Sequence, residues 1–127
     1  MLRFLSDEWL AALERAAEAA TDAVDPDLDM VIQQVVTDDD GTEVAYHLVL
    51  RGGRVRAHRG RASAPTVTFI TDRDTAARIN QGIQSAQAAF MTGGLRIGGD
   101  IRALASQQAS LAGLQDLFGA LRAETSY

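Results

Sequence analysis

Residues 30–61 have the sequence MVIQQVVTDDDGTEVAYHLVLRGGRVRAHRGR, in which apolar and polar side chains alternate over three runs. The runs are rich in valine, and a β-branched composition with a period of two residues favours β-strands. They are separated by Asp40-Gly41 and Gly52-Gly53, pairs that are typical of tight turns between antiparallel strands. The segment therefore predicts three successive strands, at residues 30–37, 43–51 and 54–61.

Two further strands are predicted later in the chain. Residues 66–71, TVTFIT, follow Pro65, which lacks an N–H donor and suits the entry to a strand. We expect this fourth strand to continue a four-strand meander. In residues 93–99, GGLRIGG, Leu95 and Ile97 alternate with Arg96, and the surrounding glycines disfavour a helix, so this segment predicts the fifth strand.

The helices are predicted from capping residues and apolar periodicity. Ser6, followed by two acids, predicts the start of a first helix, which we expect to end at Asp25-Pro26. Two short helices are expected at residues 72–80 and 86–92, and a last helical region follows Asp100. This order predicts an α+β fold, with a five-stranded sheet and helices covering mainly one face, as a single domain over residues 1–127.

Composition excludes several classes of chemistry. The chain has 127 residues, of which 46% are apolar, and it contains no cysteine. This excludes disulfides, thiolate nucleophiles and thiolate metal sites. All 12 basic residues are arginine, so lysine chemistry is excluded as well. No apolar run is long enough to span a bilayer and no secretory signal is present, so a cytoplasmic protein is expected.

Charge is distributed unevenly along the sequence. Residues 1–50 carry 2 arginines against 12 acids, whereas residues 51–127 carry 10 arginines against 5 acids. Such asymmetry fits either an ordinary solvated surface or a surface that drives association with a partner. Five arginines fall within residues 51–61, but the net charge of −5 and the lack of aromatic residues there disfavour a nucleic-acid partner. Anionic lipid head groups, met in transient membrane contact, remain an alternative for this stretch.

No catalytic or metal-binding motif is recognisable. The glycines at residues 93–99 lack the lysine and hydroxyl residue of a phosphate loop. His47 and His58 are placed on neighbouring predicted strands and can face one another, but no further ligand is spaced to support them. No enzyme activity, metal or cofactor is therefore expected.

Two segments closely resemble the sterol carrier protein type 2 domain family. They are APTVTFITDRDTAARI, residues 64–79, and AFMTGGLRIGGDIRAL, residues 89–104, and the matching residue types run in register over both. The start of the chain, FLSDEWLAAL, is similar to that of stand-alone bacterial members. The resemblance implies a sheet covered by helices, with an apolar tunnel between the two layers that binds and transfers a fatty acid, an acyl-CoA, a sterol or another lipid.

The resemblance also implies which side chains line the tunnel. Small side chains on the alanine-rich helices would leave room there, and Met91 would adapt its shape to different ligands. The expected wall consists of Phe90, Met91, Leu95, Ile97, Leu104, Leu111, Leu114, Phe118, Ile79 and Ile83.

Two alternatives remain open beside the lipid carrier. All the residues of the expected wall would also be apolar in a filled core, in which case the domain would be a dimerisation or docking module of a lipid-metabolising complex. A small isomerase or hydrolase that works inside a lipid pocket is the other alternative.

Overall fold

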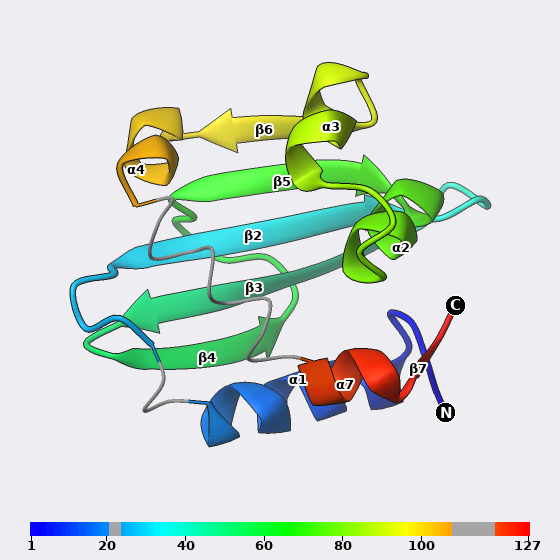
Figure 1. The fold of residues 1–127 in the computed structure, drawn as a ribbon, viewed down its shortest axis with the longest axis horizontal. Helices are drawn as coiled ribbons and strands as arrows, with labels where there is room; N and C mark the ends of the chain where they lie inside the picture. The colour runs from blue at the N-terminus through cyan, green and yellow to red at the C-terminus, as the bar shows by residue number, and fades with distance from the viewer. Residues whose placement is uncertain (21–23, 108–118) are drawn as a thin grey trace.

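The computed structural model describes residues 1–20, 24–107 and 119–127 (Figure 1). In chain order its elements are β1 (Leu2–Arg3), α1 (Asp7–Ala19), β2 (Met30–Thr37), β3 (Glu43–Arg51), β4 (Arg54–Arg59), β5 (Val67–Asp72), α2 (Arg73–Asn80), α3 (Ala86–Met91), β6 (Leu95–Gly99), α4 (Ile101–Ser106), α7 (Gly119–Ala123) and β7 (Thr125–Ser126).

The main sheet has five strands in the order β4-β3-β2-β5-β6. The strands β2, β3 and β4 pair in antiparallel fashion, β5 runs parallel to β2, and β6 runs antiparallel to β5. The predicted α+β class and the five-stranded sheet are confirmed. The predicted four-strand meander is wrong in one step, because β5 pairs with β2 rather than with β4.

Hydrogen bonds and burial explain why β5 crosses back to β2. The connecting residues 60–66 pass behind the sheet in Figure 1, where the Ala62 N–H donates to the side chain of Gln33 over 2.7 Å and the Thr66 N–H donates to Val31 O over 2.9 Å. The crossing places Val67, which is fully buried, beside the central strand. It also leaves the arginine-rich β4 at the edge, where charged side chains discourage pairing with another chain.

The helices begin where capping residues were expected to start them. The side chains of Ser6, Asp72, Ser85 and Asp100 each accept a hydrogen bond from a backbone N–H three residues later. These bonds satisfy donors that a helix start otherwise leaves unpaired. The first helix is shorter than predicted, since it ends at Ala19 rather than at Asp25-Pro26.

Helices cover one face of the sheet, as predicted. In Figure 1, α2 lies in front of the strands, on the side opposite the crossing segment, and α4 lies beyond the end of β6. The helix α1 packs against the β3–β4 side of the same face, where Trp9, Leu13 and Ala17 share a buried core with Leu50 and Val55. None of the helices in the described part of the chain is long and apolar enough to cross a membrane.

The two ends of the chain are joined in a way that the sequence patterns did not predict. The strands β1 and β7 form a small parallel sheet. Beside it, the indole N–H of Trp9 donates a buried hydrogen bond to Thr125 Oγ1 over 3.0 Å. The ring of Trp9 also contacts Phe4 edge to face, at a centroid distance of 5.1 Å. The C-terminus therefore helps to fix α1 on the sheet.

A change at Thr125 tests this link. Thr125→Val keeps the side-chain shape but leaves the buried indole N–H without an acceptor, so we expect the free energy of unfolding to fall by about 1–3 kcal/mol. Thr125→Ser retains the hydroxyl and should lose much less stability. Urea unfolding followed by tryptophan fluorescence measures both variants, and equal losses would contradict the assigned role of the hydrogen bond.

A second change tests the close approach at the end of β6. Gly99 has a φ of 93°, and a Cβ atom there would lie 2.4 Å from Thr66 O. Gly41 has a similar φ of 85° but no neighbour within 4 Å. We expect Gly41→Ala to cost roughly 1–2 kcal/mol and Gly99→Ala to cost about twice as much, because only the second also forces the backbone apart. Thermal unfolding measures both variants, and equal melting temperatures would contradict the expected difference between the two losses of stability.

Candidate functional site

The covered face of the sheet is built from rows of paired residues. The strand register places Ile97, Phe69, Gln34, Tyr46 and Arg59 in one row, with one residue from each strand. Directly paired residues point their side chains to the same face. The row is therefore apolar at β6, uncharged and polar in the middle, and charged at β4.

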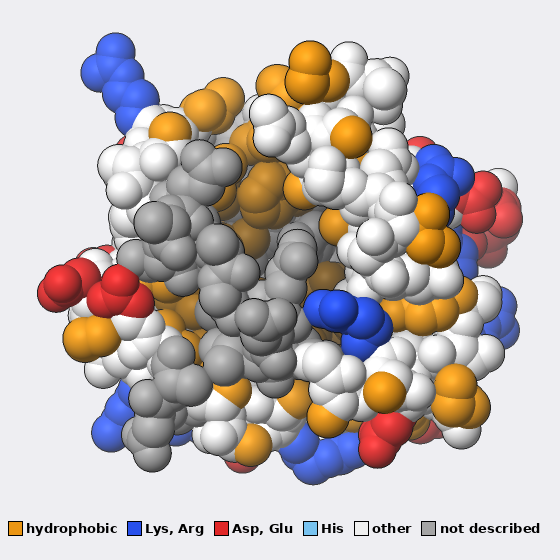
Figure 2. Space-filling model, in the orientation of Figure 1, with side chains coloured by type: hydrophobic (Ala, Val, Ile, Leu, Met, Phe, Trp, Pro, Cys, Tyr) orange, Lys and Arg blue, Asp and Glu red, His pale blue; other side chains and the backbone are white. Residues whose placement is uncertain are grey.

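Burial on this face is uneven. In the neighbouring apolar row, Val67 is fully buried and Ile32 is 6% exposed. Phe69, Leu48 and Ile97, which face the same side, are only half-buried. Figure 2 shows a hollow on this face whose floor is hydrophobic, over the part of the sheet where β5 runs in Figure 1. The face therefore combines a closed core with apolar surface that is still open.

The residues predicted to line a ligand space differ in exposure. Leu95 is buried, and Ile79, Ile97 and Leu104 are half-buried. Phe90, Met91 and Ile83 are 50%, 77% and 69% exposed. The remaining predicted residues, Leu111, Leu114 and Phe118, lie outside the described residues.

The structure brings some of these residues together. Leu95 and Ile97 lie on β6 and face the same side as Thr71 and Phe69 of β5, with which they pair. The helix α3 packs on β6 and buries Ala89 completely. Phe90 and Met91 follow Ala89 in the chain and remain accessible, as does Ile83 between α2 and α3.

Several residues of this face were not among those predicted. Phe69, Gln34 and Tyr46 lie in the central row, and Trp9 contacts the Tyr46 ring edge to face at a centroid distance of 5.8 Å. The alternation of the strands contains the signal for them, because every second residue of 30–37 and 43–51 belongs to the covered face. Burial raises the pKa of Tyr46, so its hydroxyl stays protonated and uncharged at neutral pH.

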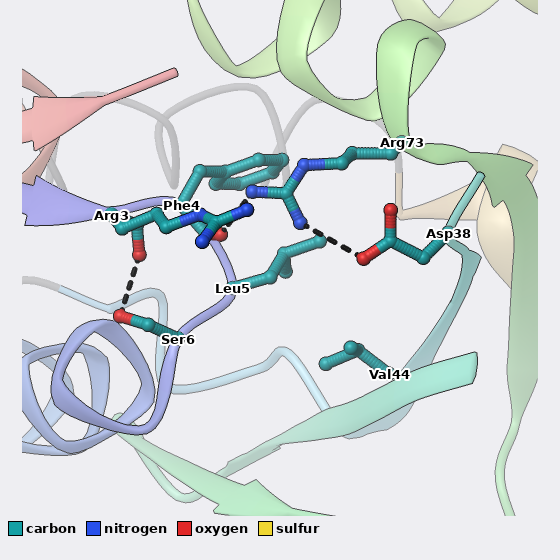
Figure 3. A pocket seen from close by; sticks show the side chains of 7 residues that line it. All are labelled: Arg3, Phe4, Leu5, Ser6, Asp38, Val44 and Arg73. Atoms are coloured by element: carbon teal, nitrogen blue, oxygen red, sulfur yellow. Dashed lines mark hydrogen bonds and ion pairs between the residues drawn. The ribbon is translucent and has the colours of Figure 1, made fainter. Parts of the chain in front are cut away.

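A small cavity of about 230 Å³ lies at one end of the covered face, between the N-terminal segment and α2 (Figure 3). Its lining residues are Arg3, Phe4, Leu5, Ser6, Asp38, Val44 and Arg73.

Arg73 ties the walls of this cavity together. Its guanidinium forms an ion pair with Asp38 over 3.4 Å, donates to Phe4 O over 2.7 Å and lies 5.8 Å from the centroid of the Phe4 ring. Leu5, in the same wall, has a φ of 67°, which is rare for leucine and is held by its surroundings. The positive charge of Arg73 is thus neutralised within the chain, and its contacts hold the N-terminal segment beside α2.

A second pocket, of about 340 Å³, lies on the opposite face of the sheet. It is lined by Val31, His47, Val49, Arg51, Arg61, Ala62, Ser63 and Ala64. The rings of His47 and His58 face one another there, as predicted, at a centroid distance of 5.2 Å. The described residues contain no group of three or more side chains able to hold a metal ion.

The uneven charge of the sequence is balanced by contacts within the chain. The described residues form six ion pairs, and each joins an arginine of residues 51–127 to a carboxylate of residues 1–50. Arg51, Arg56, Arg59 and Arg61 from the arginine-rich stretch all take part. Exposed pairs of this kind stabilise a fold by about 1 kcal/mol or less. Association with a partner through these charges stays a prediction.

Solved structures of similar fold share low sequence identity with this chain. A solution structure of the conserved hypothetical protein TT1886, possibly sterol carrier protein, from Thermus thermophilus is 22% identical, with a TM-score of 0.70, over 100% of this chain and 93% of that one. A crystal structure of sterol carrier protein 2 is 20% identical, with a TM-score of 0.68, over 94% and 97% of the two chains. A solution structure of palmitated SCP2L2 from Aedes aegypti is 20% identical, with a TM-score of 0.56, over 90% and 95%.

These structural likenesses establish the fold, and a match to a family model establishes which family the chain belongs to. Among curated protein sequences, no match to this chain is found. The model of the SCP-2 sterol transfer family, however, matches residues 10–112, which include most of α1, the whole five-stranded sheet and the helices between its strands. The chain therefore belongs to the SCP-2 sterol transfer family.

Proposed function

We propose that this protein is a non-enzymatic carrier that binds one hydrophobic ligand between its sheet and its helices and passes it to another site. Membership of the SCP-2 sterol transfer family supports binding of a lipid or another hydrophobic molecule. A fatty acid, an acyl-CoA, a sterol and other lipids are the candidate ligands. The palmitate of the mosquito neighbour is a precedent in a protein of the same fold.

The observation that carries the proposal is the incomplete burial of apolar side chains on the covered face. Phe69, Leu48 and Ile97 point towards the helices and yet keep accessible surface. Apolar surface removed from water contributes about 25 cal/mol per Å². A hydrocarbon chain that buries on the order of 300 Å² would gain roughly 7 kcal/mol before the entropy of binding is subtracted.

The proposed wall keeps the residues that the family resemblance implies. Ile97, Leu95 and Leu104 would form its β6–α4 side. Phe90, Met91 and Ile83 would stand at the entrance, where their exposed apolar surface would contact an entering ligand or a membrane. The rest of the wall would comprise Ile79, Leu111, Leu114 and Phe118.

The chemistry of the covered face supports a carrier rather than a catalyst. Over the five strands of the sheet, this face carries no aspartate, glutamate or histidine. Both histidines, His47 and His58, lie on the opposite face. Aspartate, glutamate and histidine are the commonest general acids and bases, and the Tyr46 hydroxyl on this face is held protonated because burial raises its pKa.

Native mass spectrometry and a ligand titration test the proposal. Protein purified from cells is expected to carry lipid, and the delipidated chain is expected to bind a fluorescent fatty acid saturably with one site per chain. Protein without any retained lipid, together with a titration that never saturates, would reject the carrier function.

Phe90→Asp tests the proposed entrance. The half-exposed position tolerates a carboxylate in the unbound protein, but a bound chain would desolvate it, so we expect affinity for the fluorescent fatty acid to fall by about tenfold. Ile70→Asp is the matched control, because Ile70 is 36% exposed and lies on the opposite face of β5. Equal affinities of the folded Phe90 variant and the wild type would remove Phe90 from the site.

A further inference from the structure

Two uncharged polar side chains lie together in the middle of the covered face. Gln34 and Tyr46 are directly paired across β2 and β3, so both point towards the helices. Their neighbours on the same face along the two strands are all apolar: Ile32, Val36, Val44 and Leu48. A glutamine and a tyrosine hydroxyl are therefore presented from an apolar surface.

Neither polar group has a partner in the described part of the chain. There, the Gln34 amide and the Tyr46 hydroxyl make no hydrogen bond. The adjacent Gln33, which points to the opposite face, donates to Thr68 Oγ1 over 3.3 Å and accepts from the Ala62 N–H over 2.7 Å. Both side chains are only partly buried, so their polar atoms are available to a hydrogen-bonding ligand.

The position of Tyr46 fits a group that faces an internal space. Packing of protein atoms around the ring raises the pKa of its hydroxyl. Its side chain nevertheless keeps accessible surface. Trp9 contacts the Tyr46 ring but donates its own N–H to Thr125, so it leaves the hydroxyl available.

The charged residue nearest to Gln34 and Tyr46 in their row across the sheet is already paired with carboxylates. Arg59 follows Tyr46 towards the edge of the sheet, and its guanidinium pairs with Glu14 over 3.2 Å and with Asp7 over 3.5 Å. The covered face of the five strands carries no other charged residue. On this face of the five strands, a ligand carboxylate placed against Gln34 and Tyr46 would find two hydrogen-bond donors but no cation that lacks a carboxylate partner.

We propose that Gln34 and Tyr46 form the head-group site of the carrier and select an uncharged lipid that bears one hydroxyl or carbonyl oxygen. This inference rests on the proposed lipid-carrier function and adds the class of ligand. The Gln34 amide and the Tyr46 hydroxyl donate to a carbonyl oxygen, or the amide oxygen accepts from a ligand hydroxyl. The hydrocarbon lies along Phe69 and Ile97, at the apolar end of the same row. A charged head group is disfavoured because the covered face of the five strands offers it no cation that is not already paired.

Competition between two lipids of equal chain length tests the selectivity. The delipidated full chain is loaded with Nile red, an uncharged fluorescent dye, which is then displaced by 1-dodecanol or by dodecanoate at pH 8. We expect dodecanol to bind at least tenfold more tightly than dodecanoate. Equal affinities, or tighter binding of dodecanoate, overturn the head-group assignment while leaving the carrier function in place. Absence of binding by the dye and by both lipids overturns the carrier function itself.

Variants assign the selectivity to the two residues. Gln34→Leu and Tyr46→Phe should each weaken dodecanol binding about 3- to 10-fold and change dodecanoate binding less. Tyr46→Phe removes a single oxygen and carries the test if Gln34→Leu does not fold. Gln33→Leu is the control, because it removes the neighbouring amide on the opposite face and should lower stability without changing the preference. Unchanged dodecanol affinity in folded Tyr46→Phe, or an equal loss of preference in Gln33→Leu, overturns the assignment.

Discussion

Shielding of one apolar sheet face from water is the constraint on which the rest of the structure depends. Every second residue of each strand points to this face, so the apolar side chains of five strands must be covered by something other than the sheet itself. At the end of the sheet where β3 and β4 meet, α1 and its neighbours bury Leu50 and Val55 fully. Towards β5 and β6 the cover is looser, and Phe69 and Ile97 keep accessible surface. The boundary between the layers thus combines a closed core with open apolar surface, at which we propose that the ligand binds.

The opposite face of the five-stranded sheet is built differently. It holds the segment that crosses from β4 to β5, the paired histidines and a pocket of mixed polarity. Arginines from the edge strand pair with carboxylates from the first half of the chain, so the uneven charge of the sequence becomes a set of internal ion pairs. The charges therefore join segments far apart in the sequence, while the open apolar surface lies between the layers.

The strands and the helix starts are predictable from the sequence because their signals are local. Alternation over residues 30–37 and 43–51 gives β2 and β3 with their observed bounds, and the side chains of Ser6, Asp72, Ser85 and Asp100 cap the expected helices. The pairing of β5 with β2 is not local, since an alternating strand looks the same beside any neighbour. The central polar pair was missed for a similar reason: Gln34 and Tyr46 become neighbours only through the register of two strands.

The position of a bound hydrocarbon chain relative to the sheet is the most direct measurement of the central claim. An isotope-filtered NOE spectrum of the ¹³C-labelled protein, saturated with whichever of dodecanol and dodecanoate binds more tightly, reports which methyl groups touch the ligand. We expect contacts from the methyls of Ile97 and Leu48 on the covered face and none from those of Val31 and Val49 on the opposite face. Contacts confined to Val31 and Val49 would contradict a ligand held between the sheet and the helices.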